Sequence, residues 1–408
     1  MKYSCRPRLL QATAEYELTD DGLACRALSR AAKIAFTDIR EIDVFKQRRF
    51  GSSRAYWACT IFATGQRFDL GAAHRVSLMR TEDRTPAYIP FIKEFERRAI
   101  AANPGLRFVV DEYRENFGTR LYGRAAAYAL VLLGCLPRRT SAAVCAVILR
   151  NVGPLLRGNR HAGRQLEAAF PALGARETRR LQRGMWDNIG RTFGEYAHIA
   201  ELMQFSPETP LAGQVVMDER TVETLRRLGR DARGALMFAA HLGNWEIPAM
   251  AARAAGCEIA LVYKRQPSAV ITEELKRKRA MFAARLIEAT PTAPREILGA
   301  LRDGLLVGML IDQHYAQGTE VLFFDRVCRV NPILARLART AKAPIYGARV
   351  VRLPDQRYRL EVVGPLQLSS ASSGRSDVEA TMQAVIGMIE AWIRQAPEQW
   401  MWMHTLIR

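Results

Sequence analysis

An α/β protein preceded by a small β domain is the fold class that the sequence predicts. Three patterns indicate it: strand-like runs at the start, apolar helical segments after them, and alternating strand and helix patterns from residue 234 onward. A chain of 408 residues also exceeds the usual size of one domain. We therefore expect a β domain over 1–105, a linker over 106–121 and a second domain over 122–408.

The first domain is expected to be a small antiparallel β-barrel or roll closed by one helix. Turns at Asp21-Gly22 and Thr64-Gly65 each separate two strand-like runs, and apolar residues recur at helical spacing over 88–102. This order, with the strand TDIREIDV after a basic hairpin, resembles the pleckstrin-homology-like superfold over about residues 9–103. Because that superfold hosts many functions, a structural or protein-contact module is the alternative to lipid binding.

Apolar helices are expected after the linker. The segment AAAYALVLLGCLPRRTSAAVCAVILRNVGPLLRG (125–158) is interrupted by Pro137 and Pro154, with arginines at the bends. Its longest apolar run, 125–136, is shorter than the roughly 20 residues that span a bilayer. Two interpretations stay open, helices lying in a membrane interface and a buried pair of core helices.

Strand and helix patterns then alternate to the end of the chain. Strands are expected at 234–240, 257–263, 305–312, 319–325, 345–352 and 358–364. Helices are expected from about Trp245 and over 268–287, 295–304 and 332–342, with a final helix opened by the capping box at 376–379.

The charge balance indicates an anionic partner. The formal net charge is +19, so nucleic acid, an anionic membrane surface and an acidic protein are the classes to weigh. No nucleic-acid-binding module is recognisable, and the arginines are spread through amphipathic helices. The seven cysteines are scattered and never form a Cys-x-x-Cys pair, so we expect reduced thiols without disulfides or a zinc site.

The stretch HLGNWE (241–246) is the candidate for chemistry. His241 ends a predicted buried strand, Leu-Gly makes a turn, Asn244 is expected to cap the next helix, and Glu246 falls in its first turn. Folding back in this way can bring the Glu246 carboxylate to one ring nitrogen of His241. The other nitrogen would then act as a base toward a substrate hydroxyl. The alternative is a purely structural histidine.

Several stretches together resemble the bacterial lipid A biosynthesis acyltransferases, the late lauroyl/myristoyl transferase family. They are HLGNWE, LVYKRQ (261–266), LKRKRAMFAARLI (275–287), LRDGLLVGMLIDQ (301–313), EVLFFDRVCRVNPILARLARTAKAPI (320–345) and PEQWMWMH (397–404). The resemblance runs from about Tyr122 to Arg408. It implies a lysophospholipid-acyltransferase-like α/β sandwich with a helical interfacial region.

The resemblance also implies roles for individual residues. His241 would be the general base that deprotonates an acceptor hydroxyl, and Glu246 would orient it and stabilise the imidazolium. Arg279 matches a basic position associated with phosphate or carrier binding. The positions assigned to substrate binding are Asn244, Tyr263, Arg265, Arg279, Asp312 and Gln313. The alternatives are purely structural roles: a cationic helix face for Arg279, a strand-end cap for Asp312 and a core tyrosine for Tyr263.

The implied activity is transfer of an acyl chain from acyl-carrier protein or acyl-coenzyme A to a membrane lipid, with no metal or redox cofactor. Such an enzyme would sit on the cytoplasmic face of a bacterial inner membrane, where its positive charge suits both the acidic carrier protein and anionic lipid. The rival hypotheses are a thioesterase, in which water replaces the acceptor, and a membrane- or partner-binding protein with a degenerate transferase domain.

Three departures from the family pattern bear on the acceptor. His314 stands where a second acidic residue is common, Thr405 and Leu406 follow His404 where basic residues are usual, and Asp325 replaces a glycine. Since glycine tolerates a positive φ better than Asp, the last change concerns a turn. The departures, with the additional β domain, leave another glycolipid, an ornithine-type lipid or a lysophospholipid open as the acceptor.

Overall fold

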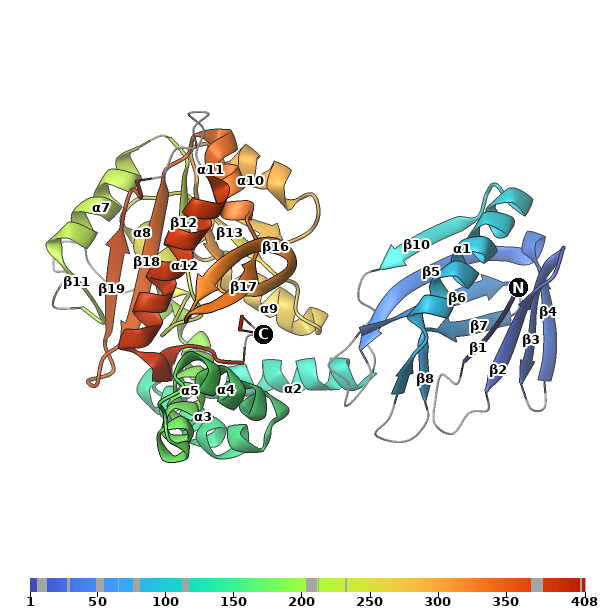
Figure 1. The fold of residues 1–408 in the computed structure, drawn as a ribbon, viewed down its shortest axis with the longest axis horizontal. Helices are drawn as coiled ribbons and strands as arrows, with labels where there is room; N and C mark the ends of the chain where they lie inside the picture. Colours follow the sequence, from blue (N-terminus) through green and yellow to red (C-terminus); the bar gives the residue numbers. More distant parts are fainter. Residues whose placement is uncertain are drawn as a thin grey trace. The chain divides into compact units, whose positions relative to one another are not determined.

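The computed structural model describes residues 1–5, 13–27, 30–48, 55–64, 66–75, 81–111, 117–202, 211, 213–231, 233–367, 377–403 and 406–407. The chain forms two compact units, drawn in Figure 1. Unit 1 is Met1–Ala125 with Gln266–Ile271, and unit 2 is Ala126–Arg265 with Thr272–Arg408. The domain boundary expected after residue 121 stays a prediction.

The described residues of unit 1 form two four-stranded sheets, the two-stranded sheet β8-β9 and one long helix. The first sheet has the order β1-β2-β3-β4 and the second β10-β5-β6-β7, so the described residues form no closed barrel. The strands are β1 Lys2–Cys5, β2 Ala14–Leu18, β3 Gly22–Ala27, β4 Arg30–Ala35, β5 Ile39–Arg48, β6 Ala55–Ala63, β7 Gln66–Gly71, β8 Ala73–Arg75, β9 Thr81–Asp83 and β10 Arg107–Asp111. The Asp21-Gly22 turn is confirmed between β2 and β3, whereas Gly65 lies outside the described residues.

Helix α1 (Thr85–Ala102) packs on the sheets because its apolar residues repeat at helical spacing. Its buried residues are Tyr88, Phe91, Ile92, Phe95 and Ala99. The expected helix is therefore confirmed. Strand β10, which lies inside the segment expected to be a linker, pairs in parallel with β5, and the linker itself stays a prediction. That pairing joins residues far apart in sequence, which local patterns do not reveal.

Unit 2 contains a seven-stranded sheet of order β11-β19-β18-β12-β15-β13-β14. Its strands are β11 Val215–Met217, β12 Ala235–Ala239, β13 Ile259–Tyr263, β14 Arg285–Glu288, β15 Leu306–Leu310, β18 Ile345–Arg352 and β19 Tyr358–Val363. The four consecutive strands β12, β15, β13 and β14 pair in parallel, so their carboxyl ends meet at one edge. Ligand sites in open parallel sheets lie at that edge.

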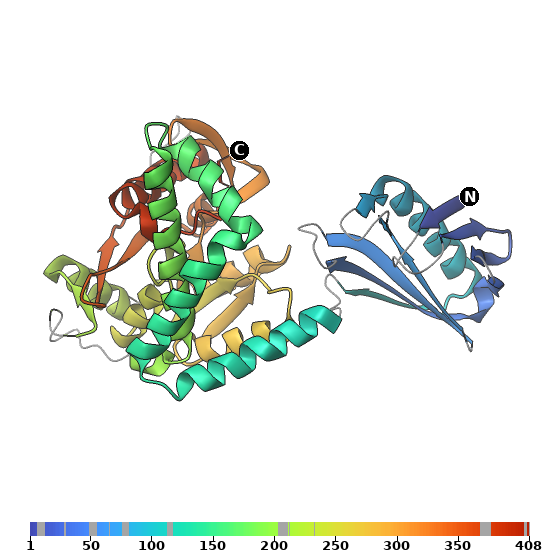
Figure 2. The same ribbon diagram turned by 90° about the horizontal axis from the view of Figure 1, so that it is seen from below.

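Helices α7, α8, α10, α11 and α12 pack along this sheet, and α3, α4 and α5 form a group beside it (Figures 1 and 2). The helices are α2 Phe117–Gly134 and α9 Ala269–Arg279, which both begin in unit 1, and α3 Arg138–Val152, α4 Arg157–Ala169, α5 Ala175–Tyr196, α6 Ile199–Leu202, α7 Glu219–Arg230, α8 Ile247–Ala254, α10 Ala293–Arg302, α11 Ile333–Ala341 and α12 Val378–Gln395. In the part of the chain that the structure describes, no helix is long and apolar enough to span a membrane.

Two predictions about unit 2 are wrong in detail. The helix expected over 268–287 ends at Arg279, and the following Arg285–Glu288 is the edge strand β14. The Ala-rich sequence favours a helix locally. In the fold, however, Phe282 is buried at the turn and the N–H of Ala284 donates to the carbonyl of Ile259. These contacts favour pairing with the sheet over continuation of the helix. At the final helix the N-cap is Asp377, which accepts from the N–H groups of Glu379 and Ala380, while Ser376 lies outside the described residues.

A tight hairpin joins β16 (His314–Phe323) to β17 (Arg326–Val330), and β17 was not anticipated. Phe323 pairs with Arg326, so Phe324 and Asp325 form a two-residue turn with φ of 50° and 59°. Positive φ at both central residues is typical of a type I′ turn. The aspartate that departs from the family pattern therefore occupies a conformation that glycine adopts more easily.

Asp325→Gly is expected to raise the free energy of unfolding by about 1 kcal/mol, because it removes the cost of a left-handed backbone at a non-glycine residue. Phe324→Gly relieves the same cost but deletes a buried ring packed on Phe323 and Trp402, so it should destabilise by about 3 kcal/mol. Urea unfolding of the full chain measures both. A loss of stability in Asp325→Gly would contradict this account of the turn.

Candidate functional site

A histidine and an aspartate meet at the carboxyl edge of the parallel sheet. Ala239, at the end of β12, pairs with Leu310, at the end of β15, and His241 and Asp312 each follow two residues later. Nδ1 of His241 lies 2.8 Å from Oδ1 of Asp312. The strand register thus brings together two predicted site residues that are 71 positions apart.

Asp312 is fully buried, and its carboxylate accepts two further hydrogen bonds. The backbone N–H of His241 donates to Oδ2 at 2.7 Å, and the indole Nε1 of Trp400 donates to the same oxygen at 2.8 Å. A carboxylate is an acceptor only, so Nδ1 of His241 carries the proton and Nε2 carries the lone pair. This arrangement fixes both the ring orientation and the tautomer that a general base requires.

Glu246, in contrast, does not serve as the partner of Nδ1. Its Oε2 accepts from Nε of Arg279 at 3.0 Å, and its Oε1 accepts from Nη2 of Arg279 at 2.5 Å and from the hydroxyl of Tyr196. The expected orientation of His241 by Glu246 is therefore corrected: the carboxylate at Nδ1 belongs to Asp312. Glu246 turns instead toward α9 and α5, whose cation and phenol compensate its burial.

Electrostatics keep Glu246 ionised despite its burial. Desolvation alone would raise the pKa of this carboxyl, but the charge of Arg279 and the hydrogen bonds from Arg279 and Tyr196 outweigh it and lower the pKa below its ordinary value. The imidazole of His241 contributes in the same direction. Glu246 is thus a fixed negative charge near the base, able to stabilise its imidazolium without touching Nδ1.

A second buried carboxylate holds the turn between His241 and Glu246. Glu195 of α5 accepts from Nδ2 of Asn244 at 3.0 Å and from both terminal nitrogens of Arg352, at 2.5 and 3.0 Å. Asn244 was expected as a helix N-cap, but α8 begins at Ile247, and the Asn244 amide oxygen instead accepts from the N–H of Glu246 at 3.2 Å. The asparagine therefore braces the turn rather than contacting open solvent.

The remaining predicted residues lie around the same edge of the sheet. Tyr263 ends β13 and its hydroxyl donates to Glu288 at 3.4 Å, Arg265 is exposed two residues later, and Gln313 is half-buried beside Asp312 in the chain. His404 and Thr405 lie outside the described residues. No group of three or more His, Cys, Asp or Glu side chains within the described ranges could hold a metal ion.

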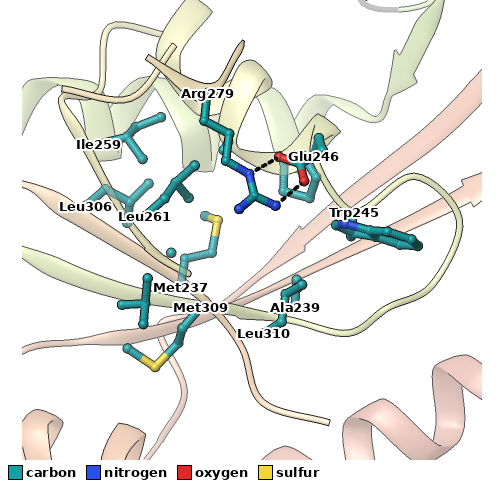
Figure 3. A pocket seen from close by; sticks show the side chains of 14 residues that line it. Met237, Ala239, Trp245, Glu246, Ile259, Leu261, Arg279, Leu306, Met309 and Leu310 are labelled. Carbon is teal, nitrogen blue, oxygen red and sulfur yellow. Dashed lines mark hydrogen bonds and ion pairs between the residues drawn. The ribbon is translucent and has the colours of Figure 1, made fainter. Parts of the chain in front are cut away.

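An apolar pocket opens beside the Glu246–Arg279 ion pair (Figure 3). Its walls come from β12, β13, β15 and α8, and Trp245 stands at one side. The apolar lining includes Met237, Ile259, Leu261, Leu306, Met309 and Leu310. The indole of Trp245 also lies 5.3 Å from the imidazole of His241, so one side chain borders both the pocket and the base.

Several residues of the site were not identified from sequence. Trp400 lies within PEQWMWMH, which was recognised only as a family stretch, while Glu195, Tyr196 and Arg352 sit in helical or strand patterns without a local signal. A glutamate in a helical run is usually a solvated charge. Only the packing of α5 against the 241–246 turn reveals that this one is buried.

Arg279→Met should lower the free energy of unfolding by about 3–5 kcal/mol near neutral pH, because it leaves Glu246 buried without a cation. In the wild type the pKa of Glu246 is lower in the folded than in the unfolded protein. Ionised Glu246 therefore stabilises the fold at pH values above its unfolded-state pKa, and this stabilisation is lost as pH falls through its folded-state pKa. In the variant, burial dominates and raises the pKa, so stability instead falls as pH rises.

Urea unfolding across pH measures this effect, with Arg285→Met as the control, since Arg285 forms an exposed pair with Asp303. The deficit of Arg279→Met should shrink as pH falls toward about 4–5, the ordinary pKa range of a glutamate, because Glu246 is by then protonated in the folded variant. A deficit that is the same at all pH values would contradict the assigned role of the ion pair.

The sequence was compared with known proteins and with family models. No curated protein sequence matches the chain significantly. Residues 119–408 match the family model of the bacterial lipid A biosynthesis acyltransferases, which confirms the resemblance inferred from HLGNWE and the stretches that follow it. The match covers well over half of the chain, and the protein therefore belongs to the bacterial lipid A biosynthesis acyltransferase family.

Proposed function

We propose that the protein transfers a fatty acyl chain from an acyl thioester to a hydroxyl of a membrane glycolipid or lipid A-like acceptor. One observation carries the proposal: the buried Asp312 carboxylate holds Nδ1 of His241 at the carboxyl edge of the sheet. A histidine fixed in this tautomer presents Nε2 as a general base. Family membership supports acyl transfer as the reaction class.

The proposed reaction needs no group beyond the two substrates. Nε2 of His241 takes the proton of the acceptor hydroxyl while its oxygen attacks the thioester carbonyl. The tetrahedral intermediate then collapses, the carbon–sulfur bond breaks, and the thiolate leaves with the proton from the imidazolium. Asp312 and the fixed charge of Glu246 stabilise the imidazolium, and the ring of Trp245 can add a cation–π contribution.

The apolar pocket is the proposed site of the acyl chain. Its lining is mostly apolar apart from the Glu246–Arg279 pair, and Trp245 lies between it and His241, so a chain in the pocket would place its carbonyl near His241. A hydrocarbon chain gains roughly 0.8 kcal/mol per buried methylene. Chain-length preference would then depend on the depth of this pocket.

The donor and the location follow from charge. Acyl-carrier protein is acidic, and both it and the coenzyme A donor carry phosphate, which suits a chain of net charge +19 and the exposed Arg265 near the sheet edge. We propose peripheral association with the cytoplasmic face of a bacterial inner membrane, where the lipid acceptor resides. His314 and Asp325 depart from the family pattern, so the acceptor is proposed as a lipid class rather than as lipid A itself.

A transfer assay tests the proposal. Purified full-length protein is incubated with labelled acyl-carrier protein and a bacterial lipid extract, and the products are identified by mass for wild type and His241→Ala. The expected result is a new acylated lipid that is lost in the variant. Free fatty acid as the only His241-dependent product would replace transfer by hydrolysis. No His241-dependent product from either donor would leave the binding-protein hypothesis.

Asp312→Asn is expected to reduce kcat about 100- to 10,000-fold, because an amide at Nδ1 no longer enforces the tautomer or stabilises the imidazolium. KM for the acyl donor should change little, since Asp312 is buried and cannot contact it. Steady-state kinetics measure both, with Asp303→Asn as a control at an exposed carboxylate. A kcat within about twofold of wild type would contradict the assignment.

Gly308→Leu is expected to shorten the preferred acyl chain. Gly308 lines the pocket from β15, and a Cβ added there would lie 2.9 Å from Cδ2 of Leu261, so a leucine must project into the pocket space. The ratio of kcat/KM for long over short donors should fall roughly tenfold or more. Gly299→Leu, at a glycine of α10 with no atom near its Cβ position, is the control. An unchanged ratio would remove the acyl chain from this pocket.

A further inference from the structure

Helix α3 packs with its small residues inward. It lies against α5, and the two helices run side by side in Figure 2. A Cβ added to Gly190 of α5 would lie 2.5 Å from the carbonyl oxygen of Cys145, and one added to Gly194 would lie 2.5 Å from that of Ser141. The buried residues of α3 are Ser141, Ala142 and Ala146. The two backbones therefore touch, and among the bulky apolar side chains of α3 it is Leu149 that packs, partly buried, against the core of unit 2.

The other bulky apolar residues of α3 are exposed. We call Val144, Val147, Ile148, Val152 and Leu155 the α3 outer face; Leu155 belongs to the short 3₁₀ segment that follows α3. Ile148 is 51% exposed and Leu155 is 83% exposed. Their spacing places them on one stripe of the helix. A surface helix of a globular protein normally buries such a stripe, whereas in α3 the stripe is exposed and small residues are buried.

The segment that carries this face is rich in arginine. Residues 126–166 contain six arginines and neither Asp nor Glu. Arg138 is largely buried beside Glu195 and Glu201, and Arg150 lies 3.5 Å from Asp187. The exposed arginines of the segment are Arg139, Arg157, Arg160 and Arg164. An apolar stripe bordered by cations fits an anionic lipid surface, in which side chains such as Ile148 enter the acyl boundary and guanidinium groups bind phosphates. Pairing with a second copy would instead bring two arginine-rich surfaces together, which is unfavourable.

Helix α5 connects this face to the site. It carries the glycines that seat α3, and also Asn188, which donates to the carbonyl of Gly243, and Glu195, which holds Asn244. A surface bound through α3 would therefore lie one helix layer from the 241–246 turn. That distance suits an enzyme whose acceptor is embedded in the same surface.

We propose that the α3 outer face docks the protein on an anionic membrane surface, through insertion of apolar side chains and contact of the flanking arginines with lipid phosphates. This rests on the proposed function in one respect only, namely that the acceptor is a membrane lipid. The face itself is defined by exposure and charge, and its occupant is the bilayer interface rather than a protein.

Vesicle sedimentation tests the proposal with the full-length chain. The variant is Val147→Ser/Ile148→Ser, and the matched control is Leu322→Ser/Val327→Ser, a cross-strand pair of exposed apolar residues on the β16–β17 hairpin. With vesicles of phosphatidylethanolamine and phosphatidylglycerol, the α3 variant should bind roughly tenfold more weakly than wild type. The control should bind as wild type does, and all three should bind vesicles of phosphatidylcholine alone more weakly.

Two further measurements separate the outcomes. The rate of acyl transfer to an acceptor dispersed in detergent should be equal in the α3 variant and wild type. If neither protein transfers the acyl chain, the proposed function is wrong, but the vesicle-binding result still tests the docking face. Wild-type vesicle binding that survives in the α3 variant would overturn the proposed face. So would a concentration-dependent dimer that the substitutions abolish, because the face would then be an interface between copies.

Discussion

The site depends on one buried carboxylate. Asp312 lies at the end of β15 and accepts hydrogen bonds from the ring and backbone of His241 and from the indole of Trp400, so three donors from two distant segments converge on it. A buried charge is tolerated only when its lone pairs are satisfied, and here the groups that satisfy it also orient the base. The strand order that places β15 beside β12 is what makes this convergence possible. The orientation of the His241 ring therefore depends directly on the strand order of the sheet.

Helix α5 contacts both the 241–246 turn and helix α3. Tyr196 donates to Glu246, Glu195 accepts from Asn244, and Asn188 donates to the carbonyl of Gly243, so one helix holds most of the 241–246 turn. Its Gly190 and Gly194 admit the backbone of α3. Three carboxylates are buried around this turn, each paired with a cation, a phenol, an imidazole or an indole, and the apolar Leu242 and Ile247 are buried beside them. Polar pairing and apolar packing therefore both hold the turn.

Local patterns predict many of the strands and helices and the hairpin turn at Asp21-Gly22, but not the pairings between segments far apart in sequence. The strands ending near His241 and Asp312 were readable because runs such as GALMFAA and LLVGMLID are short, apolar and bounded by turns. Both residues were proposed as site residues, yet Glu246 was chosen as the partner of His241 because it is close in sequence. The true pairing at Nδ1 depends on strand order, which periodicity does not encode. The same limitation hid β14 inside an expected helix and the burial of Glu195 inside α5.

Nuclear magnetic resonance of the histidine rings tests the central claim most directly, with isotope-labelled histidine and His241→Ala to assign the signal. A downfield Nδ1 proton of His241 should appear in the wild type, because Nδ1–H donates to a buried carboxylate. We expect the signal to persist in Glu246→Gln and to be lost or strongly shifted in Asp312→Asn. A signal that survives in Asp312→Asn but disappears in Glu246→Gln would show that Glu246 orients the base, and would contradict the account.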